Sequence, residues 1–247
     1  ALFPKENRKI YKKLLTNTLA RFVELSRVYH TRGRMTTHIY ENLPETHPSG
    51  TKFSVLHLAR GGCASDMKKS HAHPCQVLAD LMTIRERRGA LEDQKLCFIG
   101  DGCSMANSLI VGGLLAGMTV SCVCPQGYRP AADVLMFAHK YGPKFHLLTD
   151  PAEGVKDADV VVTAAWNTAP GTPESERRLR DFAGFQVTSG LLSGAKPDAM
   201  LLHCLPAHRG EEISTAVFEQ HADEIFTEAE NRLHVQKAVL AILLANQ

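Results

Sequence analysis

Residues 199–206, Ala-Met-Leu-Leu-His-Cys-Leu-Pro, form the stretch that decides the fold class. The first four are an unbroken apolar run with the length of a short buried β-strand. His203, Cys204 and Pro206 follow where the strand gives way to a loop. Open α/β sheets place their chemistry at the carboxyl ends of strands. The stretch therefore predicts either a functional site or a plain strand-end loop with a half-buried cysteine.

Apolar runs and helical patterns alternate along the chain after residue 90. Strands are predicted at residues 96–99, 120–123, 145–148, 159–163 and 200–203, with residues 225–226 as a sixth short strand. Helices are predicted at residues 104–116, 131–140, 174–182 and 231–244. Strands that alternate with helices at this spacing predict an α/β fold with a doubly wound parallel sheet.

The first 90 residues follow another pattern, with helical spacing over residues 5–29 and a strand-like run at residues 53–58. His73-Pro74-Cys75-Gln76 then opens a long helix, because proline is favoured at the first helical position. We predict four parts of the chain: a reduced first domain over residues 1–72, a bridging helix over residues 73–90, the main α/β domain over residues 91–230, and a C-terminal helix over residues 231–247 that packs back on the first domain.

Composition excludes several classes of protein. Of the 247 residues, 44% are hydrophobic and 22% are charged, and the net charge is +2. This balance is ordinary for a globular protein and indicates no strongly charged partner. Aromatic residues make up 6%, which is too few for the interleaved basic and aromatic surface of a nucleic-acid binder. Since no apolar run approaches the roughly 18 residues that span a bilayer, we also predict no membrane partner.

The chain has seven cysteines, and Cys97 and Cys122 fall inside predicted strands. An odd number of cysteines with core positions indicates reduced thiols. We therefore expect a cytoplasmic protein, or one of the mitochondrial matrix if the source is eukaryotic. Cys122-Val123-Cys124 lacks the spacing of a zinc-ligand pair, so no metal is predicted.

Gly100-Asp101-Gly102 stands between a predicted strand and a predicted helix, where a dinucleotide-binding loop would lie. That fingerprint needs a further glycine or alanine where this chain has Met105, and an acidic residue about 20 positions on. Residues 122–124 at that place are Cys-Val-Cys. We therefore predict no nicotinamide cofactor, and no cofactor of another kind. The glycines instead predict a turn that a different ligand approaches closely.

Two other places combine a polar group with a predicted helix start. His73 and Gln76 lie one turn apart at the amino end of a helix, where free N–H groups attract anions. The simpler alternative is that His73 only caps this helix. Arg232 is predicted to open the last helix, where its guanidinium would bind a phosphate with two hydrogen bonds. The simpler alternative for Arg232 is a surface ion pair.

Four motifs follow one another in order: His-Pro-Cys-Gln at residues 73–76, Gly-Asp-Gly with Met-Ala-Asn-Ser at residues 100–108, His-Cys-Leu-Pro-Ala-His-Arg-Gly-Glu-Glu at residues 203–212, and Glu-Ala-Glu-Asn-Arg-Leu-His at residues 228–234. Together they resemble the ornithine carbamoyltransferase family, continuously from about residue 76 and more thinly from about residue 21. The resemblance implies transfer of a carbamoyl group from carbamoyl phosphate to the δ-amine of ornithine, in a protein that is usually a trimer.

The resemblance also implies site residues. Catalytic roles fall on His73, Gln76, Cys204 and Arg232. Carbamoyl phosphate would be bound by Arg27, His73, Gln76 and Arg232. The amino-acid substrate would be bound by Asp101, Cys103, Ser104, Trp166, Thr168, His203, Cys204 and Leu205.

Departures from the family pattern concentrate at this site. The family's Ser-x-Arg-Thr-Arg phosphate loop has no counterpart before His73. Cys103 and Ser104 stand where the family has two asparagines, and Ala164 stands where it has the aspartate that would pair with the ornithine amine. Loss of an anion that faces a cationic substrate weakens binding strongly. Free ornithine is therefore expected to bind poorly.

Three interpretations remain open from the sequence. In the first, the chain is a carbamoyltransferase for ornithine or a modified ornithine, and a neighbouring subunit or partner chain supplies the phosphate loop. In the second, it is a non-catalytic family member. In the third, the scaffold runs a different reaction on an amino-acid-like ligand with His203 or Cys204. Covalent catalysis by Cys204 would need a lowered thiol pKa and an aligned base.

Overall fold

The computed structural model describes residues 72–167 and 169–245, and their side chains up to residue 239. The strands are β1 (Lys95–Ile99), β2 (Thr119–Val123), β3 (Phe145–Leu148), β4 (Val160–Thr163) and β5 (Met200–His203). The helices are α5 (Pro74–Arg88), α6 (Ser104–Leu115), α7 (Ala132–His139), α8 (Pro151–Val155), α9 (Pro173–Asp181), α10 (Ser189–Leu192), α11 (Thr215–Gln220) and α12 (Ala222–Ala245), with a 3-10 turn η2 (Gly142–Lys144). The helix predicted at residues 5–29 and the strand at residues 53–58 lie outside the described residues.

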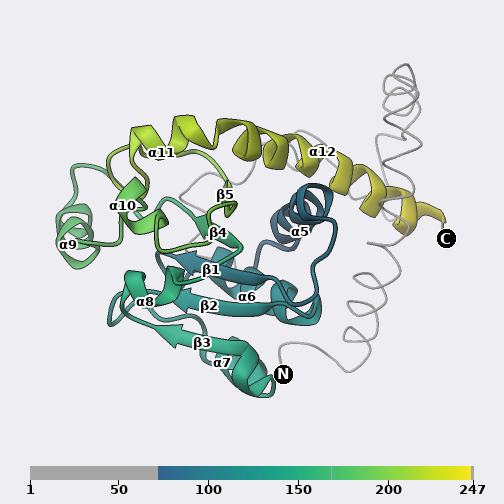
Figure 1. The fold of residues 1–247 in the computed structure, drawn as a ribbon, viewed down its shortest axis with the longest axis horizontal. Coiled ribbons are helices and arrows are strands. Elements are labelled where there is room, and N and C mark those ends of the chain that lie inside the picture. The colour runs from purple at the N-terminus through teal and green to yellow at the C-terminus, as the bar shows by residue number, and fades with distance from the viewer. Residues whose placement is uncertain (1–71, 168, 246–247) are drawn as a thin grey trace, which may run out of the picture.

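The five strands form one parallel sheet in the order β3-β2-β1-β4-β5 (Figure 1). The predicted doubly wound parallel sheet is thereby confirmed. The connection reverses direction between β1 and β4, which makes the carboxyl ends of these two strands the topological switch point. Ile99 at the end of β1 pairs with Thr163, and Thr163 pairs with His203 at the end of β5. The ends of these strands therefore lie in one row.

Side chains alternate between two buried cores, one on each face of the sheet. Along β1, Leu96 and Phe98 join the core that faces α5, α6 and α7, whereas Cys97 and Ile99 join the opposite core beside α8 and α11. All four side chains are fully buried. A parallel sheet covered on both faces needs continuous apolar strands, which explains why the strands appear in the sequence as unbroken apolar runs.

Helix α12 packs against α5 (Figure 1). A small apolar contact of Ala79, Met82 and Val235 lies between the two helices. Polar groups extend the contact on both sides of it. Asn231 donates to the Thr83 hydroxyl at 2.9 Å, and Arg87 donates to a carboxylate oxygen of α12 at 2.6 Å. Helix α5 is thus fixed against the last helix of the chain.

The predicted start of the last helix is wrong by nine residues. Helix α12 begins at Ala222, so residues 225–226 are helical and the predicted sixth strand does not exist. Arg232 lies in the helix interior and does not open it. The buried face of α12 carries Ile225, Glu228, Asn231 and Val235 at helical spacing. Since two of these four are polar, apolar periodicity alone could not reveal the first turns.

Three short helices and the 3-10 turn were not predicted. Helix α8 begins where the Asp150 side chain accepts a hydrogen bond from the backbone N–H of Ala152. Helices α10 and α11 are capped in the same way by Thr188 and Ser214. Such elements are too short for hydrophobic periodicity to detect. The division of the chain into four parts stays a prediction.

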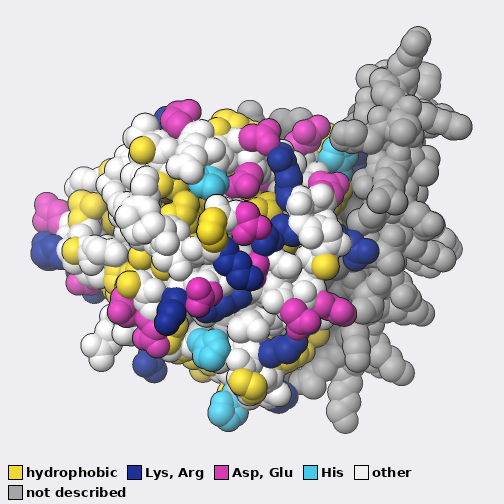
Figure 2. Space-filling model, in the orientation of Figure 1, with side chains coloured by type: hydrophobic (Ala, Val, Ile, Leu, Met, Phe, Trp, Pro, Cys, Tyr) yellow, Lys and Arg dark blue, Asp and Glu magenta, His cyan; other side chains and the backbone are white. Residues whose placement is uncertain are grey.

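Charges of both signs are interspersed on the face that Figure 2 shows, over the described part of the molecule. Basic side chains there lie beside acidic ones and do not form a broad basic surface. Among the described helices, none has the length and apolar character needed to cross a membrane.

Candidate active site

Gln76, in the first turn of α5, lies at the centre of a buried polar cluster. Its side-chain nitrogen donates to Asp80 Oδ1 at 2.8 Å and to Glu228 Oε1 at 2.7 Å. Arg232 Nη1 donates to the amide oxygen Oε1 of Gln76. An amide has two N–H donors and an oxygen with two lone pairs. Both donors are therefore occupied, and Gln76 can offer a ligand only an acceptor on Oε1.

Glu228 connects this cluster to the end of β5. Its second oxygen, Oε2, accepts the backbone N–H of His203 at 2.8 Å. The motifs at residues 73–76, 203–212 and 228–234 therefore meet at one carboxylate. The sequence reasoning missed both Asp80 and Glu228. The sequence signal that could have found them is a spacing of four residues, which places two side chains on the same face of a helix. Asp80 lies four residues after Gln76, and Glu228 lies four residues before Arg232.

His73 lies immediately before α5, and its imidazole ring is partly buried. Its side chain makes no capping hydrogen bond, and its backbone N–H donates to Ser108 Oγ at 2.7 Å. The ring atom Nε2 is buried and has no hydrogen-bond partner among the described residues. Burial, reinforced by the nearby Arg232 charge, lowers the pKa of His73. A neutral imidazole therefore faces the cluster, so the alternative of a simple cap does not describe it.

The loop after β5 is held by a buried pair, His203 and Glu212. The backbone N–H of Leu205 donates to His203 Nδ1 at 2.9 Å, so Nε2 carries the ring hydrogen and donates to Glu212 Oε1 at 3.0 Å. The same oxygen accepts the backbone N–H of His208 at 2.6 Å. Leu205 has a φ of +48° and precedes a cis peptide bond to Pro206. The pair thus fixes a loop whose backbone conformation is unusual.

Replacing Glu212 by alanine is expected to lower the free energy of unfolding by about 3 kcal/mol, because it leaves two buried N–H donors without an acceptor. Urea unfolding followed by circular dichroism measures this loss. Glu211→Ala is the matched control, since its carboxylate approaches His208 only at 3.8 Å and is partly exposed. An equal loss in the two variants would contradict the assigned role of Glu212.

Cys204 is not an activated nucleophile in this structure. Burial, together with the nearby Glu228 and Asp80 charges, raises the pKa of its thiol well above the ordinary value. Its side chain packs against the core that faces α5 and α6, whereas the His203 ring faces Glu212. A lowered pKa and an aligned base were the two conditions for covalent catalysis. The geometry supplies neither of them.

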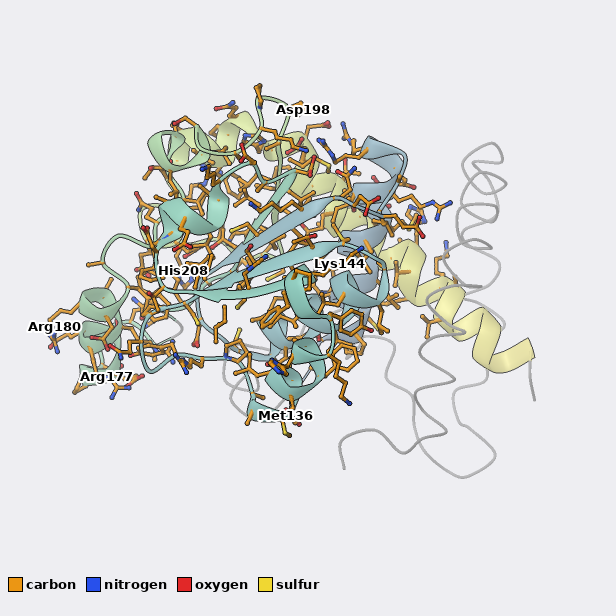
Figure 3. All side chains as sticks on the ribbon, turned by 60° about the horizontal axis from the view of Figure 1, so that its bottom comes forward. Met136, Lys144, Arg177, Arg180, Asp198 and His208 are labelled. Atoms are coloured by element: carbon orange, nitrogen blue, oxygen red, sulfur yellow. The ribbon has the colours of Figure 1, made fainter. Side chains whose placement is uncertain are left out.

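The carboxyl end of β1 carries Asp101, which is paired with Arg178 of α9 at 2.7 Å. Arg178 also donates to the carbonyl of Trp166 at 2.9 Å and lies over the Tyr128 ring, 5.0 Å from its centroid. Its neighbours Arg177 and Arg180 point outward from α9 (Figure 3). Asp101 was predicted to bind an amino acid, and an incoming amine would have to compete with Arg178 for it.

Unpartnered polar atoms gather near the same strand ends. Ser104 Oγ, Trp166 Nε1 and Asn167 Oδ1 are buried and make no hydrogen bond to any part of the chain that the structure describes. The Trp166 ring stacks on Phe182 at 4.7 Å, which fixes its plane. Cys103 is the N-cap residue of α6, and burial raises the pKa of its thiol. The predicted roles of these residues stay predictions, and Arg27 and Thr168 lie outside the described residues.

Gly102 serves the fold and not the approach of a ligand, which corrects the sequence interpretation. A Cβ atom at this position would lie 2.3 Å from the carbonyl carbon of Arg129 and 2.3 Å from the nitrogen of Pro130. The backbone N–H of Gly102 also donates to the carbonyl of Tyr128 at 2.8 Å. The chain's own backbone therefore occupies the space that the glycine leaves.

His208, Glu211 and Glu212 place one possible ligand atom each within 4.8 Å of one another. Glu212 already accepts two hydrogen bonds that hold the loop after β5. Those bonds account for its position without an ion. We assign no metal to this group, and the absence of a metal stays a prediction.

Comparison with known proteins gives one family. The model of the aspartate/ornithine carbamoyltransferase Asp/Orn-binding domain matches residues 92–243. The chain is 46% identical over 177 residues to an ornithine carbamoyltransferase of Pyrococcus abyssi, covering 70% of this chain and 56% of that protein. It is 45% identical over 172 residues to one of Methanosarcina mazei, covering 70% and 57% respectively. The chain thus spans little more than half the length of the curated relatives it matches.

Solved structures agree with this assignment. The ornithine carbamoyltransferase of Pyrococcus furiosus has a TM-score of 0.64 at 44% identity, with 69% of this chain and 56% of that chain covered. The anabolic ornithine carbamoyltransferase of Campylobacter jejuni has a TM-score of 0.66 at 41% identity, with 71% and 60% covered. Sequence and architecture therefore point to the same family.

Proposed function

Since this chain belongs to the aspartate/ornithine carbamoyltransferase family, we propose that it binds carbamoyl phosphate at His73, Gln76 and Arg232 and transfers the carbamoyl group to an amine. The acceptor is ornithine or a modified ornithine-like amino acid. The relatives named above carry ornithine carbamoyltransferase in their names.

One observation supports the proposal most strongly, the pattern of free donors and acceptors around Gln76. A carbamoyl group presents N–H donors on one side and a carbonyl oxygen on the other. Gln76 has acceptor capacity alone, on Oε1, because Asp80 and Glu228 occupy both its amide hydrogens. Arg232 has donors alone, and His73 adds an unpartnered ring nitrogen. The cluster is thus complementary to a carbamoyl group in one orientation.

The chemistry follows from this placement. The neutral acceptor amine attacks the carbamoyl carbon, the new C–N bond forms, and the C–O bond to phosphate breaks with its electron pair leaving on phosphate. The departing phosphate takes the proton that the amine nitrogen loses. Arg232 and His73 stabilise the oxyanion that develops on the carbonyl oxygen. Gln76 holds the carbamoyl nitrogen. The nucleophile belongs to the substrate, so the protein contributes by positioning and by exclusion of water.

The acceptor side favours a substrate other than free ornithine. Ala164, at the end of β4, is buried and offers no charge where the family pattern has an aspartate. Asp101 is already paired with Arg178. An amino acid whose α-amine is acylated would not need that anion. We therefore extend the proposal to an N-acylated ornithine as the preferred acceptor.

The phosphate side supports the participation of another chain. Within the described residues, Arg232 is the arginine that donates a hydrogen bond to Gln76, and a single guanidinium leaves most oxygens of a phosphate without a partner. We propose that a neighbouring subunit, as in a trimer, or a partner chain supplies further phosphate contacts. We also propose that the protein is located in the cytoplasm.

A non-catalytic family member is the second candidate, and the uncharged Ala164 at the end of β4 favours it. Calorimetric titration with carbamoyl phosphate, followed by ornithine and N-acetylornithine, separates the two. The carbamoyltransferase requires both carbamoyl phosphate and the preferred acceptor to bind, with release of inorganic phosphate when the two are present together. Binding without phosphate release would support the non-catalytic member. No binding of carbamoyl phosphate at any protein concentration, including those that favour oligomers, would refute the carbamoyltransferase and leave the non-catalytic member.

A further inference from the structure

Helix α12 covers the free edge of the sheet as well as α5 (Figure 1). Strand β5 ends the order β3-β2-β1-β4-β5, so no further strand pairs with its outer side within the described residues. Glu224 Oε2 of α12 accepts the backbone N–H of Leu201 at 2.8 Å. Glu228 Oε2, one helical turn later, accepts the backbone N–H of His203 at 2.8 Å. Two carboxyl groups of one helix thus satisfy alternate N–H donors of an edge strand, as a neighbouring strand would otherwise do.

The two carboxyl groups differ in what else they contact. The side chain of Glu224 is 22% exposed, and its Oε2 also lies 2.8 Å from His221 Nδ1. Glu228 is 1% exposed, and its Oε1 accepts a hydrogen of the Gln76 amide at 2.7 Å. Glu224 therefore contributes to the sheet edge, whereas Glu228 connects the sheet edge to Gln76 of α5.

The contacts of Gln76 determine the orientation of its amide. The amide nitrogen donates to Asp80 and Glu228, and the amide oxygen accepts from Arg232. With the amide turned over, its oxygen would face the Asp80 carboxylate and its hydrogens would face the guanidinium. Asp80 and Glu228 therefore fix the amide so that its oxygen, which has a second lone pair, can accept from a ligand.

The charges of this cluster balance when Glu228 is neutral. Burial, reinforced by the Asp80 charge, raises the pKa of Glu228 well above its ordinary value. Burial raises the pKa of Asp80 to about 6, and the hydrogen bond from Glu228 limits this increase. At neutral pH the proton is therefore on Glu228, and the Arg232 guanidinium balances the ionised Asp80. A protonated carboxyl group keeps acceptor capacity, which allows the bonds to Gln76 and His203.

We propose that Glu228 is a positioning residue for both substrates of the carbamoyl transfer, an inference that rests on the proposed function. Through Oε1 it fixes the Gln76 amide, whose oxygen accepts from the carbamoyl nitrogen. Through Oε2 it fixes the backbone of His203, directly before Cys204 and Leu205, which are predicted to bind the acceptor amino acid. One buried side chain thereby holds the donor-binding group and the acceptor-binding strand end in a fixed relation. Glu228 acts on the substrates through these residues.

Glu228→Leu tests the proposal because leucine is apolar and removes both acceptor oxygens. Calorimetry should show carbamoyl phosphate binding weakened by about tenfold, which corresponds to about one lost hydrogen bond. The KM for N-acetylornithine, measured from phosphate release, should rise by a similar factor. Glu228→Gln keeps the neutral state and one acceptor oxygen, so it should show smaller changes in the same direction. This second variant also supplies the comparison if Glu228→Leu does not fold.

Glu224→Leu is the matched control. It removes a hydrogen bond of the same length from the same strand, two residues earlier, and Glu224 makes no printed contact with Gln76 or Arg232 among the described residues. The variant should lower the urea midpoint of unfolding, as Glu228→Leu does. It should leave the affinity for carbamoyl phosphate and the KM for N-acetylornithine within about twofold of the wild type, as expected for a residue away from the site.

Hydrogen exchange followed by ¹⁵N NMR measures the positioning without any ligand. The side-chain amide of Gln76 is assigned by its absence in Gln76→Leu. The hydrogens of this amide and the backbone N–H of His203 should exchange faster in Glu228→Leu than in the wild type. In Glu224→Leu the backbone N–H of Leu201 should exchange faster, while those of Gln76 and His203 should keep their wild-type rates.

The outcomes separate this proposal from the proposed function. A wild type that binds no carbamoyl phosphate, yet shows the expected exchange pattern, refutes the substrate and supports Glu228 as the connection between α5 and β5. Equal losses of affinity in Glu224→Leu and Glu228→Leu overturn the proposal, because a general loosening of α12 would then explain both. Unchanged exchange of Gln76 and His203 in both Glu228 variants overturns it as well.

Discussion

Replacing Arg232 by methionine is expected to weaken carbamoyl phosphate binding by about 100-fold, as measured by calorimetry at neutral pH. Truncation of one member of a buried, hydrogen-bonded charge pair costs about 2–5 kcal/mol, and each 1.4 kcal/mol is about a tenfold change in affinity. Arg232 donates to Gln76 and is the donor-only member of the cluster. The variant removes a ligand donor and also the fixed position of the Gln76 oxygen.

Loss of the Arg232 guanidinium has a second consequence, for the carboxyl groups of Asp80 and Glu228. The Arg232 charge lowers the pKa of both Asp80 and Glu228, so its removal should raise both pKa values further. Arg232→Lys should lose about tenfold in affinity, because a lysine restores the charge without the planar pair of donors. These graded losses would distinguish a general charge effect from the geometry of the guanidinium.

Arg87→Met is the matched control for Arg232. Arg87 is also an arginine at the contact of α5 with α12, yet it pairs with the exposed Asp223 and is itself 39% exposed. Its replacement should leave carbamoyl phosphate affinity unchanged within about twofold, as expected for a surface ion pair. Equal losses for Arg87→Met and Arg232→Met would show that the effect reflects helix contact and not ligand binding.

Replacing Gly102 by alanine should lower the free energy of unfolding by about 3 kcal/mol, the upper range for an overpacked site. The added Cβ would meet backbone atoms of Arg129 and Pro130 at 2.3 Å and of Tyr128 at 2.5 Å. Backbone atoms in a fixed turn cannot move aside as the end of a flexible side chain can. Urea unfolding at pH 7 measures the loss.

Gly190→Ala is the control for this prediction. Its added Cβ would meet only the Thr188 hydroxyl oxygen, at 3.8 Å, and Gly190 lies in helix α10. The substitution should be neutral or stabilise the protein by up to about 1 kcal/mol, since alanine loses less backbone freedom on folding. If Gly102→Ala were as stable as Gly190→Ala, the close contact with residues 128–130 would be wrong.

Strands β1, β2, β4 and β5 were predictable because both of their faces are buried. Residues 96–99, 120–123 and 200–203 are apolar runs bounded by polar or glycine-containing segments, and the structure confirms all three as strands. Helix α5 was predictable from Pro74 at its first position. The first turns of α12 were not, since Glu228 and Asn231 occupy its buried face. A buried polar residue in a helix has the sequence signature of a surface residue until its partner is known.

The site was predictable in its parts but not in its connections. Four ordered motifs identify the family, and the sequence alone points to His73, Gln76 and Arg232. Their common element, Glu228, was missed, as was Asp80. Each lies four residues from a predicted site residue, yet a carboxylate at that spacing is also common on a solvated helix face. Only the packing of α5 against α12 shows that these two carboxylates are buried.

The sequence by itself determined the α/β class, the alternation of strands and helices, and membership of the carbamoyltransferase family, because these depend on local apolar runs and on ordered motifs. The tertiary structure alone decided how the charges of the site are balanced. Gln76 and Glu228 are 152 positions apart in the chain and 2.7 Å apart in the fold. The burial of both side chains and their hydrogen bond depend on that distance, which local sequence does not encode.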